Sequence, residues 1–281
     1  MSETENVTTS ASVAETTDDK KLAVGAKIGE DAEFVILYHG PVGFKGRAEF
    51  LRIMLEDAGA DYSNSANNLY GPQGVMDRFR GSADGVKTEI AGLAPLFYPP
   101  ALWHRPKNDQ PVVRINQVAA CMTYLGEVLG YRPSSAAERA RADGITLNAL
   151  DYISLGRLSF HPVNNTASYH TQEKEGDAAS KKFSEGTMLF FLNHFEKVLK
   201  NNKDPTGPVA AGPGVTYADF ALYHVLNATI HQFNNEKYEF AWDTADVPTL
   251  KAFQAKFHAR PALVAYREST REPPFDTNSM M

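Results

Sequence analysis

Tyr38 is the residue whose type and position most directly suggest chemistry. It ends a short apolar run, Phe34-Val35-Ile36-Leu37-Tyr38, which has the composition of a buried strand. A glycine-bearing loop over 40–46 follows, and helically spaced apolar residues then predict a helix that stops at Gly59. A hydroxyl here would face a helix N-terminus, where partial positive charge favours an anion. The alternative is a strand-end tyrosine that packs its ring and leaves its hydroxyl in water.

The cysteine and the histidines offer no comparable pattern. Cys121 lies in the apolar run 118–122, which predicts a buried and inert thiol. One thiol cannot form an internal disulfide, and the chain has no Cys/His cluster for zinc. His224 and His231 fall on similar faces of one predicted helix, where core or surface positions suit them better than a metal site. We therefore expect no metal.

Composition excludes several classes of function. The chain has 281 residues, 43% apolar and 22% charged, with a formal net charge of -6. It lacks the basic patch of a nucleic-acid-binding protein, and no apolar run approaches the roughly 18 residues of a membrane span. Residues 1–31 are rich in Ser, Thr, Glu and Asp, which predicts a disordered tail without the features of a signal peptide. We expect a cytoplasmic protein with no membrane or nucleic-acid partner.

Residues 32–130 predict a small α/β domain of order β-α-β-α-β-β-α. The first helix is followed by a weak strand near 61–63 and a helical stretch near 73–80. A strand can begin at Ala101, just after two prolines, and the polar turn 104–109 makes a hairpin with 111–115. Asn116 can then cap a helix that ends near Leu129, and residues 131–137 form a linker.

Residues 138–271 have helical periodicity throughout. The fold class is therefore α/β plus all-α. The segment 161–180 is polar and is expected to be a mobile segment that could act as a lid, and residues 272–281 are expected to form a second tail. The predicted helices are a long one from Glu138 that breaks at 161–165, and further helices over 181–200, 218–233, 247–258 and 262–268.

Four motifs resemble those of the soluble glutathione transferases, in particular the tyrosine-type sigma, mu, pi and alpha classes. The resemblance covers about residues 33–270 and implies a thioredoxin-like domain, a C-terminal helical bundle and a two-fold homodimer. The motifs are Leu37-Tyr38 before Gly46-Arg47-Ala48-Glu49, Pro99-Pro100-Ala101-Leu102 (similar to the family's cis-proline turn at Pro100), Gln117, and the capping pattern Thr216-Tyr217-Ala218-Asp219-Phe220.

The resemblance also implies roles for single residues. Tyr38 would donate a hydrogen bond to the glutathione sulfur, and Arg47 would orient Tyr38 or meet the glutamyl end. A solvated or structural arginine is the alternative for Arg47, and an exposed helical aspartate is the alternative for Asp151. The implied glutathione-binding residues are Pro100, Ala101, Gln117, Val118 and, across the dimer, Asp151; the implied walls of the second-substrate pocket are Phe44, His161 and Tyr169.

Two departures qualify the resemblance. The loop after Tyr38 is longer than in tyrosine-type classes, and Val118 stands where the family has a serine that binds the γ-glutamyl carboxylate. The leading hypothesis is an enzyme, a glutathione transferase of the detoxification type, with glutathione as co-substrate and a small electrophile as its partner. The alternatives are a glutathione-dependent isomerase or ether-cleaving lyase, and a non-catalytic binding protein that kept the fold.

Overall fold

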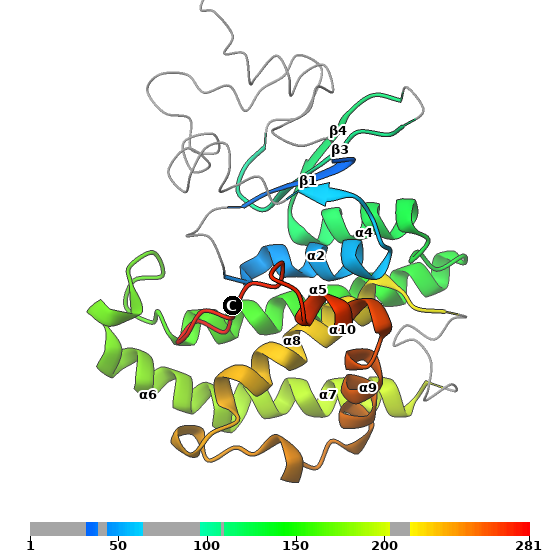
Figure 1. The fold of residues 1–281 in the computed structure, drawn as a ribbon. Coiled ribbons are helices and arrows are strands. Elements are labelled where there is room, and N and C mark those ends of the chain that lie inside the picture. Colours follow the sequence, from blue (N-terminus) through cyan, green and yellow to red (C-terminus); the bar gives the residue numbers. More distant parts are fainter. Residues whose placement is uncertain (1–31, 39–43, 64–95, 108–109, 203–213) are drawn as a thin grey trace, which may run out of the picture.

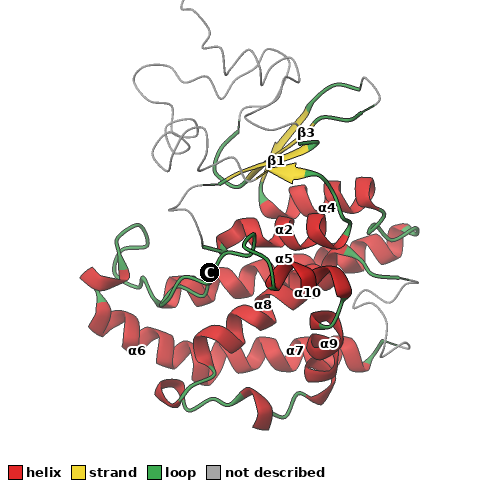
Figure 2. Cartoon of the chain, in the orientation of Figure 1, coloured by secondary structure: helices red, strands yellow, loops and turns green. Residues whose placement is uncertain are grey.

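The computed structural model describes residues 32–38, 44–63, 96–107, 110–202 and 214–281 (Figure 1). A small sheet lies on two helices, α2 (Glu49–Asp57) and α4 (Val118–Leu129). Figure 2 shows the strands on one side of this helix pair and the remaining helices on the other. Because α2 and α4 contact both layers, their sequences carry apolar residues on more than one face.

The sheet has the strand order β2-β1-β3-β4. Its strands are β1 (Phe34–Leu37), β2 (Tyr62–Ser63), β3 (Ala101–His104) and β4 (Val113–Asn116). β1 pairs in parallel with β2 and antiparallel with β3, and β3 forms a hairpin with β4. The expected first strand, weak second strand and hairpin are confirmed, while the helical stretch expected at 73–80 lies outside the described residues.

The C-terminal layer is helical. Its centre is α8 (Tyr217–Phe233), which is buried on nearly every face, and the Asp219 carboxylate caps its start by accepting from the Thr216 N–H and Oγ–H, both at 2.7 Å. The expected capping pattern is thereby confirmed. The other helices are α5 (Ala136–Ser159), α6 (Glu173–Phe183), a π-helical turn η3 (Ser184–Met188), α7 (Leu189–Lys200), α9 (Pro248–His258) and α10 (Pro261–Arg267).

Two local expectations are corrected. The segment 161–180 is not polar loop throughout, because α6 already begins at Glu173. The side chain of Gln172, buried just before it, holds the preceding loop by accepting from the N–H groups of Val163 and Asn164 at 2.9 and 3.1 Å. Asn116 does not cap α4, because its amide donates to the Tyr98 carbonyl at 3.2 Å.

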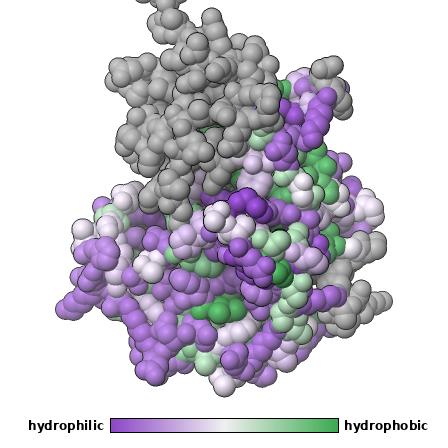
Figure 3. Space-filling model, viewed as in Figure 1, coloured by the Kyte–Doolittle hydropathy of each residue, from purple (hydrophilic) through white to green (hydrophobic). Residues whose placement is uncertain are grey.

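The segment after α10 is packed rather than free. The N–H of Lys45 donates to the Pro274 carbonyl at 2.8 Å, so this segment crosses the start of α2. Met280 is fully buried against Gly156 of α5, where a Cβ atom would collide with its sulfur. The face seen in Figure 3 is mostly hydrophilic over the helical layer, with small hydrophobic patches between helices. Within the described ranges, no helix combines the length and apolarity needed to cross a membrane.

Candidate active site

Strand pairing brings three predicted site residues to one edge of the sheet. Leu37, the last residue of β1, pairs with Ala101, the first residue of β3, and Ala101 pairs with Asn116, the last residue of β4. Tyr38 and Gln117 directly follow β1 and β4, so both lie at this edge. Since neighbouring strands are about 4.8 Å apart, the row spans about 10 Å, a distance that an extended tripeptide can cover.

Tyr38 is buried, with 5% of its surface exposed. Its hydroxyl oxygen accepts a hydrogen bond from the backbone N–H of Arg47 at 3.0 Å, at the start of the helical segment that leads into α2. Burial raises the pKa of the Tyr38 hydroxyl above its ordinary value, although nearby arginines oppose the shift. The hydroxyl therefore stays protonated at neutral pH.

Gly46 allows this close approach of Tyr38. Its φ of +52° favours glycine, and a Cβ atom there would lie 2.6 Å from Cε1 of Tyr38 and 2.7 Å from the Phe44 ring, besides meeting the hydroxyl itself. The Tyr38 and Phe44 rings are 5.6 Å apart. The glycine thus sets the position of the hydroxyl against the helix start, and Phe44 forms the wall beside it.

Arg47 joins this edge to the helical layer. Its guanidinium donates to the Ser154 hydroxyl of α5 at 2.6 Å, and burial lowers the pKa of Arg47, with the charge of Arg157 acting in the same direction. Arg157 also lies close enough to influence the pKa of Tyr38. The sequence prediction missed both Ser154 and Arg157, because no motif marks them and their helix is identified only by its apolar spacing.

The turn before β3 and the turn before α4 have unusual backbone conformations. The Pro99–Pro100 bond is cis, as the resemblance implies. Gln117 has φ 72° and ψ 119°, a conformation that non-glycine residues rarely adopt. A positive φ such as that of Gln117 costs on the order of 1–3 kcal/mol, and strained residues of this kind cluster at active sites.

The N-terminus of α4 opens beside Gln117. Val118 is its first residue and its side chain is 4% exposed, so the valine packs into the core. The side chain of Gln117, the residue at the cap position, forms no capping hydrogen bond within the described part of the chain. The first N–H groups of a helix lack intrahelical partners and attract anions. The backbone N–H of Val118 can therefore bind an anion, although the valine side chain has no hydrogen-bond donor.

Three predicted site residues do not join this group. Asp151 is exposed on α5. His161 is bound through Nδ1 to the Ala167 carbonyl at 2.9 Å, and burial lowers its pKa. The Tyr169 hydroxyl donates to Asp177 at 2.5 Å, and its ring packs 6.2 Å from Phe160. Of the predicted pocket walls, Phe44 is the one in contact with Tyr38.

Neither the cysteine nor the histidines that the structure describes form a second candidate site. Cys121 is completely buried, and burial raises the pKa of its thiol to about 12, which confirms the prediction of an inert cysteine. In the part of the chain that the structure describes, no group of three His, Cys, Asp or Glu residues could hold a metal ion.

Comparison with known proteins shows which family this architecture resembles. Residues 159–270 match the family model of the glutathione S-transferase C-terminal domain. The helical part of the chain is therefore similar to this domain over the matched residues. Curated protein sequences gave no match.

Solved structures extend the likeness to the whole fold. The chain is 19% identical to a pi-class glutathione S-transferase of Onchocerca volvulus, with TM-score 0.58 and coverage of 84% of this chain and 92% of that one. It is 20% identical to NaGST-2, with TM-score 0.57 and coverage of 87% and 100%. It is 18% identical to monomeric Na-GST-3 of Necator americanus, with TM-score 0.59 and coverage of 86% and 100%. The glutathione transferase fold, a thioredoxin-like domain followed by a helical domain, is thereby confirmed.

Proposed function

We propose that this chain is a glutathione transferase of the tyrosine type, in which the Tyr38 hydroxyl stabilises the glutathione thiolate. The observation that carries the proposal is the row of Tyr38, Ala101 and Gln117 at one sheet edge, beside two helix starts. We call Tyr38, Arg47, Pro100, Ala101, Gln117 and Val118 the thiol site. Cytoplasmic location and a role in detoxification are part of the same proposal.

The energetics of the thiolate favour a donor such as Tyr38. A free cysteine thiol has a pKa of about 8.5, and a hydrogen bond to a charged group contributes about 1.5–3 kcal/mol. At about 1.36 kcal/mol for each pH unit, this lowers the thiol pKa by about 1–2 units. The thiolate then attacks the electrophilic carbon. A C–S bond forms, the leaving group departs with its bonding electrons, and the thiol proton goes to solvent.

Glutathione would lie along the sheet edge. The backbone of Ala101, next to Pro100, pairs with the cysteinyl residue, while Gln117 and the Val118 N–H hold the γ-glutamyl carboxylate at the start of α4. Arg47 orients Tyr38 through its backbone and anchors α5 through its side chain. The electrophile lies beside Phe44, with His161 and Tyr169 as more distant walls.

The test is conjugation of glutathione to 1-chloro-2,4-dinitrobenzene by the wild type, Tyr38→Phe and Tyr124→Phe. Tyr124 is the matched control, because its hydroxyl binds His104 Nδ1 at 2.6 Å in the same domain. We expect kcat/KM to fall about 10- to 100-fold at neutral pH for Tyr38→Phe alone. Equal rates for all three proteins would exclude Tyr38 as the donor.

Calorimetric titration with glutathione separates the alternatives. Binding without turnover on this and other electrophiles would support a non-catalytic binding protein, for which Val118 is the favouring observation. Turnover of isomerase or ether-cleaving substrates in the absence of conjugation would support the other alternative. No glutathione binding at all would overturn the proposal.

We further propose that two copies of the chain form a homodimer through an apolar strip on α5 and α7. The strip consists of Leu147, Leu155, Leu158 and Phe190, of which Phe190 is 71% exposed, and Asp151 lies within it. Exposed apolar patches of this kind mark interaction sites. In sedimentation, Leu155→Glu should convert dimer to monomer, while Val163→Glu, at a loop residue that is more exposed than Leu155, should not. A wild-type monomer would contradict the dimer and with it the role of Asp151 across the interface.

A further inference from the structure

Two arginine side chains lie at the junction between the thiol site and α5. The backbone N–H of Arg47 donates to the Tyr38 hydroxyl at 3.0 Å, and its guanidinium donates to the Ser154 hydroxyl at 2.6 Å. Arg157 follows Ser154 by three residues on α5, and residues at this spacing are neighbours on one face of a helix. The face of α5 that binds Arg47 therefore also carries Arg157.

Neither arginine forms an ion pair with a carboxylate in the part of the chain that the structure describes. The guanidinium of Arg157 makes one hydrogen bond there, to the uncharged Asn165 carbonyl at 3.1 Å. Asp276 lies near enough to His161 to act on its pKa, but it forms no ion pair with Arg157. Burial lowers the pKa of Arg47, and the like charge of Arg157 lowers it further. The two positive charges are thus close together and uncompensated.

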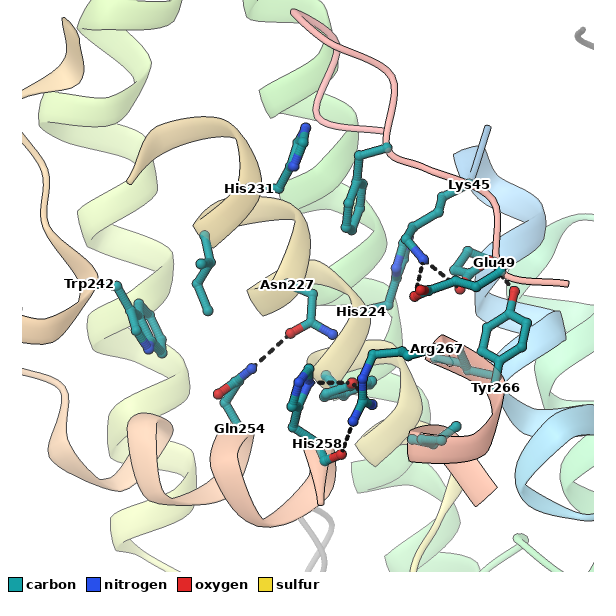
Figure 4. Close-up of a pocket in the computed structure, with 16 residues that line it drawn as sticks. Lys45, Glu49, His224, Asn227, His231, Trp242, Gln254, His258, Tyr266 and Arg267 are labelled. Atoms are coloured by element: carbon teal, nitrogen blue, oxygen red, sulfur yellow. Dashed lines mark hydrogen bonds and ion pairs between the residues drawn. The ribbon is translucent and has the colours of Figure 1, made fainter. Parts of the chain in front are cut away.

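A buried cation on the other face of α2 is treated differently (Figure 4). The ammonium of Lys45 lies 3.2 Å from Glu49 and 2.5 Å from Glu272, so the chain neutralises it with its own carboxylates. Beside Tyr38 the corresponding anions have to come from bound molecules. A pair of guanidiniums partly removed from water favours such anions, because each is stabilised by an opposite charge.

The glutathione thiolate would offset one of the two charges. It would lie at the Tyr38 hydroxyl, and Arg47 is the arginine that is bonded to this hydroxyl. Arg157 then remains positive. Burial sets the direction of the pKa shifts of Tyr38 and His161, and the charge of Arg157 acts on both. Its guanidinium is therefore near the hydroxyl and near His161, the region assigned above to the electrophile.

We propose that Arg157 is a specificity-determining residue, which gives the enzyme a preference for electrophiles that carry a carboxylate. A guanidinium can bind a carboxylate through two parallel hydrogen bonds. The carboxylate lies at Arg157 while the electrophilic carbon faces the thiolate at Tyr38. The proposal rests on the proposed transferase function, because it concerns the second substrate of that reaction.

The test compares 4-chloro-3-nitrobenzoate with its methyl ester as electrophiles. With both compounds a C–S bond forms at the carbon that bears chlorine, chloride leaves with its bonding electrons, and the thiol proton goes to solvent. The measured quantity is the ratio of kcat/KM for the acid to kcat/KM for the ester, so intrinsic reactivities cancel between proteins. Arg157→Gln should lower this ratio about tenfold or more. Arg141→Gln, at an exposed position of α5, removes the same charge and should leave the ratio unchanged.

Two further variants identify what the arginine contributes. Arg157→Lys keeps the positive charge and should retain a ratio clearly above that of Arg157→Gln. Arg157→Met, which keeps an apolar stem, replaces Arg157→Gln if that variant fails to fold. Equal losses of the acid and ester rates would show that Arg157 supports the fold or the thiol site, and would overturn the proposal. A lysine ratio as low as the glutamine ratio would also overturn it, because the charge would then not matter.

Binding of the preformed products separates this proposal from the transferase function. The glutathione conjugates of the acid and of the ester are titrated into the wild type and Arg157→Gln by calorimetry. A loss of affinity about tenfold larger for the acid conjugate would support the specificity even in a protein that shows no turnover. Equal losses for the two conjugates would overturn the specificity and leave the transferase function standing. Binding of neither conjugate would overturn both.

Discussion

The two faces of the segment 45–57 hold polar groups in opposite ways. On one face, Gly46 and Arg47 present backbone groups to Tyr38, and the Arg47 side chain bonds an uncharged serine. On the other face, Lys45, Glu49 and Arg52 form a buried cluster of full charges. The first face is held by hydrogen bonds among a hydroxyl, a backbone N–H and a guanidinium, whereas the second neutralises its charges internally.

The difference lies in where the partners come from. The Tyr38–Arg47 bond joins residues nine positions apart. The charge cluster is closed by residues from the other end of the chain, because Glu49 also accepts from the Tyr266 hydroxyl at 3.2 Å and Lys45 binds Glu272. The arrangement of the first face therefore depends on local backbone geometry, and that of the second depends on a complete set of distant side chains.

Of the substitutions considered, removal of the Glu49 charge should have the largest effect on the free energy of unfolding. Glu49→Gln leaves the buried Lys45 and Arg52 with one carboxylate fewer, and breaking a buried ion pair in this way costs about 3–5 kcal/mol. We expect a loss of that size in the free energy of unfolding, measured by urea titration. Glu127→Gln removes one partner of the exposed pair with Arg132 and should cost far less, because solvent screens an exposed pair. Equal costs for the two variants would show that the buried cluster contributes no more than a surface pair.

The pH dependence of stability gives a second check on Glu49. Burial alone would raise its pKa, but Lys45 and Arg52 outweigh burial and hold the pKa below the ordinary value of 4.5. A carboxyl with a lowered folded-state pKa stabilises the fold fully above pH 4.5, and this contribution is lost as the pH falls toward the folded-state value. The loss between pH 5 and pH 3 should be shallower in Glu49→Gln than in the wild type. Parallel curves would contradict the ion-pair account.

A methyl group at Gly46 should disrupt the first face, where Gly46 packs against Tyr38. Gly46→Ala combines a positive φ with a collision against Tyr38 and Phe44, whereas Gly59→Ala has a positive φ and no atom within 4 Å of the added Cβ. Both variants should lose about 1 kcal/mol of stability from the backbone. Gly46→Ala alone should also lose most of its conjugation activity, because the Tyr38 hydroxyl must move. Full activity in Gly46→Ala would show that the hydroxyl position does not matter.

The sequence predicted the first face well because its signals are local. An apolar run, a tyrosine at its end, a glycine and a proline pair each specify backbone geometry within a few residues, and the sheet then aligns them. The shorter-range errors have local causes too: the Asn116 amide binds a carbonyl instead of capping α4, and Gln172 orders a loop that composition marks as mobile.

The second face could not be predicted in the same way. Lys45, Glu49 and Arg52 have the sequence pattern of an ordinary solvated helix face, and only the packing of α8 and α10 buries them. Ser154 and Arg157 are likewise single polar residues on a helix, and nothing in their neighbours indicates which residue each will meet. Tertiary contacts determine the partners of these side chains, and those contacts cannot be predicted from a single sequence.

Substitution of Val118 has the smallest expected effect. It tests whether a side-chain donor at the start of α4 strengthens anion binding by the backbone N–H groups. Val118→Ser would add a hydroxyl at the first turn of α4, where an anion is already favoured. Val118→Ala is its control, since it removes similar apolar bulk from a buried position without adding a donor. We expect the serine variant to bind glutathione about three- to tenfold more tightly than the alanine variant in calorimetry, the value of about one ordinary hydrogen bond. Both should be less stable than the wild type by similar amounts, because the lost packing is shared. Equal affinities would mean that the γ-glutamyl carboxylate does not lie at this helix start, even if Tyr38 still activates the thiol.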